Sequence, residues 1–203
     1  DVDGEYDASG GNTTFSAAGR LQLGGTATSL GTLTESTGTV EYDGGTQDVL
    51  AEDYNNLEID QSGVKSQSAG TMTVAGTMTV QSAATYALDT RNITVTGNTT
   101  SPGTIRISTG TYTANGATNI SGTLSITGVG EYDANGTFTA SGGNVTFTAD
   151  GFLKCASSVS SLGTLSSANG TVIYDKASGT QNVRPGTYNN LTIDQNGNHQ
   201  IGS

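Results

Sequence analysis

The chain has 203 residues, a formal net charge of −11 with only seven Lys and Arg, and 33% hydrophobic residues. Nucleic-acid binding needs basic stripes and a membrane span needs a long apolar run, and this sequence has neither. Low hydrophobicity also fits a disordered chain, but regular alternation and only two Pro favour a folded single domain over residues 1–203.

The first part of the chain, about residues 4–63, returns as about residues 136–197. Ser29-Leu30-Gly31-Thr32-Leu33 returns unchanged at 161–165, and Gly45-Thr46-Gln47 returns at 179–181. The spacing between these two motifs is slightly longer in the second copy, so an insertion lies near 176–178. An insertion that leaves both flanks in register lies in a loop. Residues 64–135 form the intervening coils of what we interpret as a duplicated array.

Short runs that alternate polar with β-branched or aromatic residues follow one another along the whole chain. They include 92–96, 123–126 and 144–148, and Gly, Asn and Asp separate them. This alternation predicts short strands, and no stretch has the apolar spacing of a helix. Several glycines recur at a six-residue spacing: Gly70 and Gly76, then Gly110, Gly116, Gly122 and Gly128.

The six-residue spacing predicts an all-β, three-sided parallel β-solenoid with essentially no α-helix. A sandwich needs wider turn spacing and a propeller needs blades of about forty residues. Three six-residue sides give a coil of about 18–20 residues and about ten coils in all. The irregular segments 24–36 and 150–163 favour a right-handed helix, and a left-handed hexapeptide-type helix is the alternative.

Parity predicts which side chains point into the solenoid. The inward set consists of apolar residues that alternate with Thr, Ser, Asn or charged residues: Leu21, Leu23, Val40, Tyr42, Leu57, Ile59, Val74, Met78, Val80, Ile93, Val95, Ile105, Ile107, Leu124, Ile126, Val145, Phe147, Leu191 and Ile193. Cys155 aligns with Leu23 of the first copy, so we expect a small inward hydrophobic residue there.

The best-preserved motif is Tyr-Asn-Asn-Leu, which occurs as Tyr54, Asn55, Asn56 and Leu57 and again as Tyr188, Asn189, Asn190 and Leu191. We interpret it as a structural corner where one coil enters its next strand. Asn adopts the backbone angles of turns, and its amide can satisfy backbone groups that a corner leaves unpaired.

The sequence predicts no catalytic residues, no cofactor and no maintained metal site. The one His and one Cys supply neither a nucleophile–base set nor a cluster of ligands. Asp1, Asp3 and Asp7 resemble a calcium loop only loosely, because the final Glu is missing. The second copy replaces Asp48 with Asn182 and Glu58 with Thr192, so a solubilising acidic face is the simpler interpretation.

Eight Asn-x-Ser/Thr triplets are candidate glycosylation sites if the source glycosylates Asn. They begin at Asn12, Asn92, Asn98, Asn119, Asn135, Asn144, Asn169 and Asn190. Thr-x-Thr pairs also recur, and stacked Thr rows can order water and bind ice; outward Thr on a strand is the simpler interpretation.

Residues 170–193, with Gly-Thr-Val-Ile-Tyr-Asp, Gly-Thr-Gln and Gly-Thr-Tyr-Asn-Asn-Leu, resemble repeats of large secreted microbial surface proteins. Those repeats are similar to filamentous-haemagglutinin-type and autotransporter-type β-helices. The resemblance covers most of the chain and implies a right-handed parallel β-helix outside the cell, with no family-defined functional residues.

We therefore expect a non-enzymatic extracellular or cell-surface protein, a segment of a filament, sheath or adhesin. Its expected partners are copies of the same repeat stacked end to end, and glycans or a cell surface, but no nucleic acid. The alternatives are a carbohydrate- or ice-binding module and a polysaccharide-active β-helix enzyme. An enzyme of the lyase type needs Lys or Arg at its site, and the basic residues here are scattered and are not duplicated by the repeat.

Overall fold

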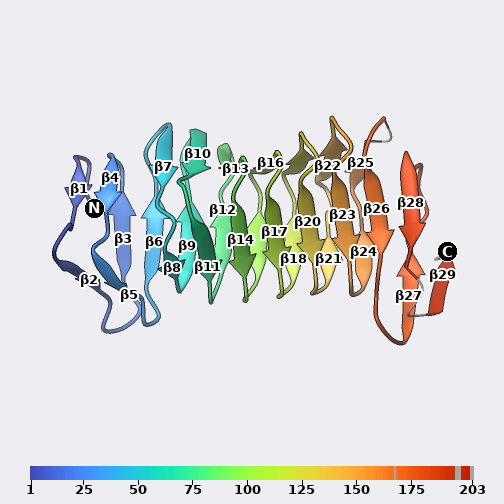
Figure 1. Cartoon of the computed structure of the whole chain (residues 1–203), viewed down its shortest axis with the longest axis horizontal. Coiled ribbons are helices and arrows are strands. Elements are labelled where there is room, and N and C mark those ends of the chain that lie inside the picture. The colour runs from blue at the N-terminus through green and yellow to red at the C-terminus, as the bar shows by residue number, and fades with distance from the viewer. Residues whose placement is uncertain (167, 195–197, 202–203) are drawn as a thin grey trace.

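The computed structural model describes residues 1–166, 168–194 and 198–201, and these residues form an all-β rod without a helix (Figure 1). All strand pairs are parallel, and the chain winds through about 9 turns. The expected parallel β-solenoid is confirmed, with slightly fewer coils than the sequence predicted.

Three sheets form the three sides of the rod. The first contains β3 (Arg20–Leu23), β6 (Thr39–Tyr42), β9 (Asn56–Ile59), β12 (Met78–Val80), β15 (Thr99–Ser101), β18 (Thr118–Ile120), β21 (Phe138–Thr139) and β24 (Val159–Ser161). The second contains β7 (Gln47–Val49), β10 (Gly63–Gln67), β13 (Ala84–Leu88), β16 (Thr104–Ile107), β19 (Thr123–Ile126), β22 (Asn144–Phe147) and β25 (Thr164–Leu165). The third contains β8 (Asp53–Tyr54), β11 (Thr71–Val74), β14 (Asn92–Val95), β17 (Thr111–Ala114), β20 (Glu131–Ala134), β23 (Phe152–Cys155), β26 (Thr171–Tyr174) and β28 (Asn190–Ile193).

Six further strands pair in twos near the two ends of the rod. β1 (Tyr6–Asp7) pairs with β4 (Ala27–Ser29), β2 (Asn12–Thr14) pairs with β5 (Thr32–Thr34), and β27 (Thr180–Val183) pairs with β29 (Asn198–Ile201). The register between neighbouring coils pairs Thr39 with Asn56 and Met78 with Thr99, so the coils differ in length along the rod. These two spacings bracket the coil length that the sequence predicted.

The core is a column of inward side chains enclosed by the three sheets. Most of the residues that parity placed inside are buried, as in β16, where Ile105 and Ile107 alternate with half-exposed positions. Leu191 was wrongly placed inside, since 42% of it is exposed, and Leu21 and Ile193 are only partly buried. Among the described strands, β28 is the last of its sheet, so no further coil packs over Leu191.

Glycines occupy the three corners because neighbouring coils approach too closely there for a Cβ atom. At the corner between the third and first sheets, Gly76, Gly97, Gly116 and Gly136 form a column. A Cβ on Gly116 would lie 2.2 Å from the carbonyl oxygen of Gly97. A second column contains Gly103, Gly122, Gly143 and Gly163, and a third contains Gly110, Gly130 and Gly151. The three columns explain the regular spacing of glycines in the sequence.

The two copies of the repeat do not occupy equivalent sides of the rod. β6 of the first copy belongs to the first sheet, whereas the matching strand β26 belongs to the third. The step from β6 to β26 is therefore not a whole number of three-strand coils. The second copy is rotated by one side relative to the first.

Each copy contains an opening where two of the three sheets are interrupted. In the first copy, β4 is hydrogen-bonded only to β1 and β5 only to β2, while β7 and β8 end their sheets, so only the first sheet continues past this point. Figure 1 shows a wider spacing between β4 and β7 than between β7 and β10. In the second copy, β24 and β25 end their sheets in the same way, and among the described strands only the third sheet continues.

Candidate functional site

The Tyr-Asn-Asn-Leu motif lies at a corner between two sheets, with Tyr54 at the end of β8 and Leu57 in β9. The hydroxyl groups of Tyr42 and Tyr54 are 3.0 Å apart in the buried core of the coil that contains β6, β7 and β8. Tyr42 Oη accepts a hydrogen bond from Leu50 N at 3.1 Å, and Tyr54 Oη donates to Leu50 O at 2.7 Å. The two tyrosines thus satisfy a backbone segment that has left the sheet.

The second copy repeats these contacts at matching positions. The hydroxyl groups of Tyr174 and Tyr188 are 3.3 Å apart, Arg184 N donates to Tyr174 Oη at 3.1 Å, and Tyr188 Oη donates to Arg184 O. Both copies therefore contain the same hydrogen-bond network between two tyrosines and one backbone segment. The change from Leu50 to Arg184 leaves this network intact, because the contacts use backbone atoms.

A glutamine bridges each opening at its corner. Gln47 Nε2 donates to Leu23 O at 3.0 Å and to Gly25 O at 2.9 Å. Gln181 Nε2 donates to Cys155 O and Ser157 O, both at 2.6 Å. These amides take over part of the bonding that a continuous sheet would supply. In the sequence, Gly-Thr-Gln marks the repeat, but the pattern gives no sign of this bridging role.

Asn56 joins coils on both sides of its own. Its Nδ2 donates to Gly38 O at 3.2 Å, and its Oδ1 accepts from Thr77 N at 2.9 Å and from the Thr77 hydroxyl at 3.0 Å. Asn190 Nδ2 makes the matching bond to Gly170 O at 3.4 Å. This geometry agrees with a structural corner.

A carboxylate cluster at the first sheet contains Glu58 of the predicted acidic face together with Glu41, which the sequence did not single out. Glu41, Glu58 and Asp60 place carboxylate oxygens within 4.8 Å of one another. Arg20 Nη1 lies 2.6 Å from Glu41 Oε2 and 2.7 Å from Glu58 Oε2, and Gln81 Nε2 donates to Glu58 Oε1 at 2.6 Å. The Glu41 side chain is only 5% exposed, so it depends on Arg20 for its charge balance. The sequence signal was the register of charges one coil apart.

The weak calcium candidates Asp1, Asp3 and Asp7 are exposed. They are not part of the carboxylate cluster that the structure shows among the described residues. Asp7 accepts a hydrogen bond from Ser9 N, which lowers the pKa of that carboxyl. Asp43 and Asp175, which match between the copies, each hold one buried carboxylate oxygen without a hydrogen-bond partner among the described residues. Burial raises the pKa of Asp175, and Asp133 adds to this effect.

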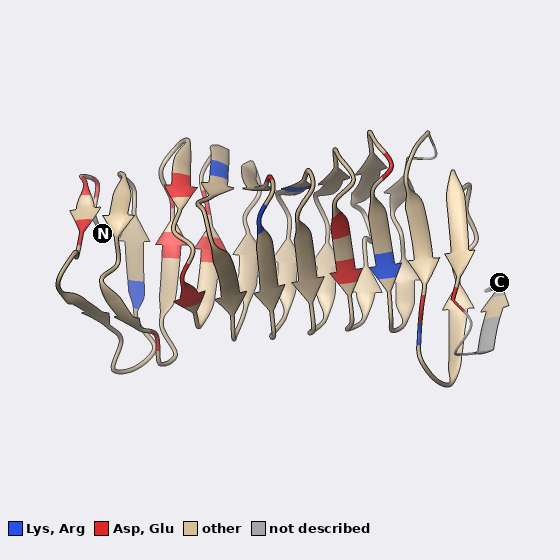
Figure 2. Cartoon of the chain, in the orientation of Figure 1, with Lys and Arg blue, Asp and Glu red and all other residues tan. Residues whose placement is uncertain are grey.

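Figure 2 shows that acidic residues gather on β6, β7 and β8, while basic residues are scattered along the rod. Lys65 of β10 lies inside the rod with no exposed surface. Its Nζ donates to Gln61 O at 2.8 Å and to Ser62 O at 3.3 Å, so it closes a corner. Burial lowers the pKa of Lys65, and the carboxylates of Asp60 and Asp43 oppose this.

Cys155 is buried in β23, as expected for a small inward residue, and burial raises the pKa of its thiol. Seven of the eight candidate glycosylation sites are exposed, namely Asn12, Asn92, Asn98, Asn119, Asn135, Asn144 and Asn190, whereas Asn169 is half-buried. The structure thus leaves most of these asparagines at the surface.

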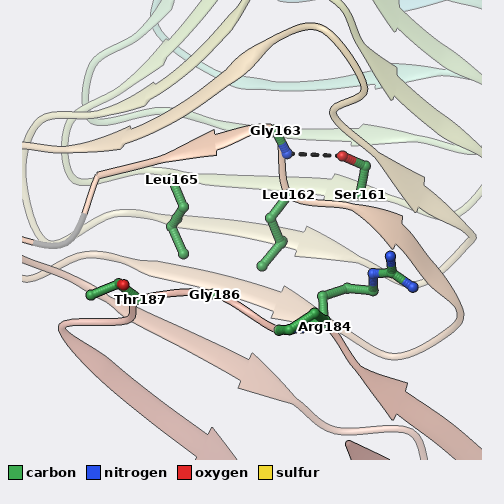
Figure 3. A pocket seen from close by; sticks show the side chains of 8 residues that line it. Ser161, Leu162, Gly163, Leu165, Arg184, Gly186 and Thr187 are labelled. Carbon is green, nitrogen blue, oxygen red and sulfur yellow. Dashed lines mark hydrogen bonds between the residues drawn. The ribbon is translucent and has the colours of Figure 1, made fainter. Parts of the chain in front are cut away.

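Each opening forms a pocket on the outside of the rod. The first cleft, of about 500 Å³, lies between β4 and β7 and reaches β10. Thr26, Thr28, Thr46, Ser66 and Ser68 supply hydroxyl groups to it. The second cleft, of about 300 Å³, lies between β24–β25 and residues 184–187 (Figure 3). In Figure 3, Leu162 and Leu165 point toward the segment that carries Gly186 and Thr187.

No family model, curated protein or solved structure matches the chain. The resemblance to secreted microbial surface repeats therefore stays a prediction. In the described part of the chain, no helix has the length and apolar character needed to cross a membrane.

Proposed function

We propose that the protein is a non-enzymatic structural segment, a rigid β-solenoid rod within an extracellular or cell-surface filament, sheath or adhesin. This proposal rests on the contacts that both copies of the repeat retain. The two copies keep the paired tyrosines, the bridging glutamine and the corner asparagine with the same partners. All of these contacts lie within the rod.

The copies diverge where side chains face outward. Arg20 matches Phe152, Glu41 matches Ile173 and Glu58 matches Thr192, so the second copy lacks the ion-pair cluster of the first. A duplicated catalytic or ion-binding site would keep its chemical groups. Conserved internal bonds with variable outward residues are what selection for shape alone produces.

The proposal includes contact between copies of the repeat placed end to end. Within this chain, the two copies already follow one another along one axis, joined by continuous parallel sheets. A neighbouring chain can extend the same axis by pairing strand edges, which is a heterologous contact and gives filaments.

The test is sedimentation and electron microscopy of the isolated protein under native conditions. We expect rods and a concentration-dependent series of longer assemblies. A particle that stays monomeric at every concentration contradicts self-assembly. The remaining proposal is then a rigid segment of an adhesin. Turnover of an acidic or neutral polysaccharide that is lost on replacing one basic residue contradicts the non-enzymatic proposal as a whole.

A further inference from the structure

The first cleft has two walls made of strand edges that run in the same direction. In the part of the chain that the structure describes, β4 is hydrogen-bonded on one side only, to β1, and β7 on one side only, to β10. β3 and β6, the strands that precede β4 and β7 in successive coils, pair in parallel, so β4 and β7 run in the same direction and their free edges face one opening. The chain order places β4 and β7 on the same side of successive coils.

We propose that the first cleft binds an extended segment of another polypeptide, which inserts between β4 and β7 as an additional parallel strand. A single extended backbone carries N–H and C=O groups on both sides and can bond both edges at once. A sugar or a small polar ligand has no comparable repeat of donors and acceptors along both walls. The volume of about 500 Å³ lies in the usual range of binding pockets.

The lining residues define the chemistry of the inserted strand. Among them, Thr28 and Asp48 are exposed and face outward, whereas Ala27 is buried on the inward side, as is the neighbouring Val49 of β7. Gln47 already occupies the corner end of the cleft through its bonds to Leu23 O and Gly25 O. The strand therefore needs small inward residues, with hydroxyl or basic residues facing outward beside Asp48.

Charge separates the two clefts. The second copy has Asn182 in place of Asp48, and Arg184 in place of Leu50 lines its cleft. A strand with a central Lys is attracted to Asp48 and repelled near Arg184. The structure thus assigns a basic strand to the first cleft in preference to the second.

The probe is a fluorescent, end-blocked peptide Thr-Ala-Lys-Ala-Thr, with Thr-Pro-Lys-Pro-Thr as its control. Proline keeps the charge and the extended shape but removes two backbone donors. Fluorescence anisotropy should show saturable binding of the first peptide at concentrations up to about 1 mM and binding at least about tenfold weaker for the proline peptide.

Asp48→Lys should weaken binding by about tenfold, while Asp150→Lys, at an exposed turn elsewhere, should leave it unchanged. Nuclear magnetic resonance of the unmodified protein gives a second measurement, in which the amides of β4 and β7 should shift on titration and those of β17 should not. The absence of saturable binding, equal binding of both peptides, or shifts confined to other strands each overturns the proposal. Competition by a neutral oligosaccharide at β4 and β7 overturns it in favour of a sugar site.

Discussion

At the scale of single residues, polar side chains maintain the solenoid wherever its sheets are interrupted. Asn56, Gln47 and the paired tyrosines each bond backbone atoms of a neighbouring coil or loop. A buried backbone group without a partner costs about 1–3 kcal/mol, so each of these side chains has a measurable effect on stability.

We predict that Asn56→Ala lowers the free energy of unfolding by about 1 kcal/mol or more, because its amide serves both Gly38 O and Thr77 N. Asn190→Ala should cost less, since the described contacts of its side chain reach only Gly170 O, and Asn189 also donates to that oxygen. Urea denaturation measures both, with the exposed Asn119→Ala as the control. Unchanged stability together with lost adhesion or assembly would make the motif a recognition site instead.

A second prediction concerns pH. Six tyrosines are buried: Tyr42, Tyr54, Tyr86, Tyr112, Tyr132 and Tyr174. Burial raises the pKa of Tyr42 to about 12 and also raises the pKa of the other five. Exposed tyrosine ionises near pH 10, so above about pH 10 the unfolded chain loses protons that the folded chain retains, and stability falls as pH rises.

Below about pH 10 these groups are protonated in both states and contribute no pH dependence. Tyrosinate absorbance and circular dichroism, followed together during alkaline titration, check the prediction. We expect the buried tyrosines to ionise in one step that coincides with loss of strand signal. Gradual ionisation with the fold intact would contradict the burial of these side chains.

At the scale of strands and corners, sequence parity predicted most of the core. The alternation of Leu124 and Ile126 with small polar residues was sufficient, because a strand with one buried face has a period of two. The parity of apolar residues gives the wrong inward face in β10, where Lys65 is fully buried and Val64 is half-exposed. The backbone carbonyls of Gln61 and Ser62 accept hydrogen bonds from Lys65, which allows the ammonium group to be buried. A hydropathy pattern contains no information about such backbone partners.

The openings could not be predicted from strand patterns, because a strand with one neighbour has the same alternation as a strand with two. The segment between β7 and β8, Leu50-Ala51-Glu52, has no glycine, but the regular corner at 89–91 has none either, so the glycine pattern does not mark the opening. The tyrosine hydroxyls bond the Leu50 and Arg184 backbone there, but Tyr42 reads in the sequence as a core residue and Tyr54 and Tyr188 as motif residues.

The glycine columns give a matched pair of substitutions. We predict that Gly116→Ala destabilises the rod by more than about 2 kcal/mol, because its Cβ would lie 2.2 Å from the carbonyl oxygen of Gly97 and backbone would have to move. Gly45→Ala should change stability by less than about 0.5 kcal/mol, since no described atom beyond its chain neighbours lies within 4 Å of the added Cβ. Thermal and urea unfolding measure both, and equal effects would contradict close stacking at the corner.

At the scale of the whole molecule, the openings divide a rod that otherwise depends on contacts between adjacent coils. In such arrays, stability is approximately a sum of coil stabilities and interfaces between neighbours, so a weak interface separates regions that open independently. The first opening keeps one sheet and the Gln47 bridge. Strands β14, β17 and β20 have hydrogen-bonded neighbours on both sides.

We therefore predict that amides of β1, β2, β4 and β5 exchange with solvent deuterium at least about tenfold faster than those of β14, β17 and β20. Gln47→Ala should widen this difference because it removes two hydrogen bonds that cross the opening, whereas Gln22→Ala, on the continuous first sheet, should not. Hydrogen-exchange mass spectrometry resolves these segments. Uniform protection along the rod would contradict this prediction. It would mean that the single continuous sheet couples the coils as strongly as three sheets do. The opening would then affect the shape of the rod but not its stability.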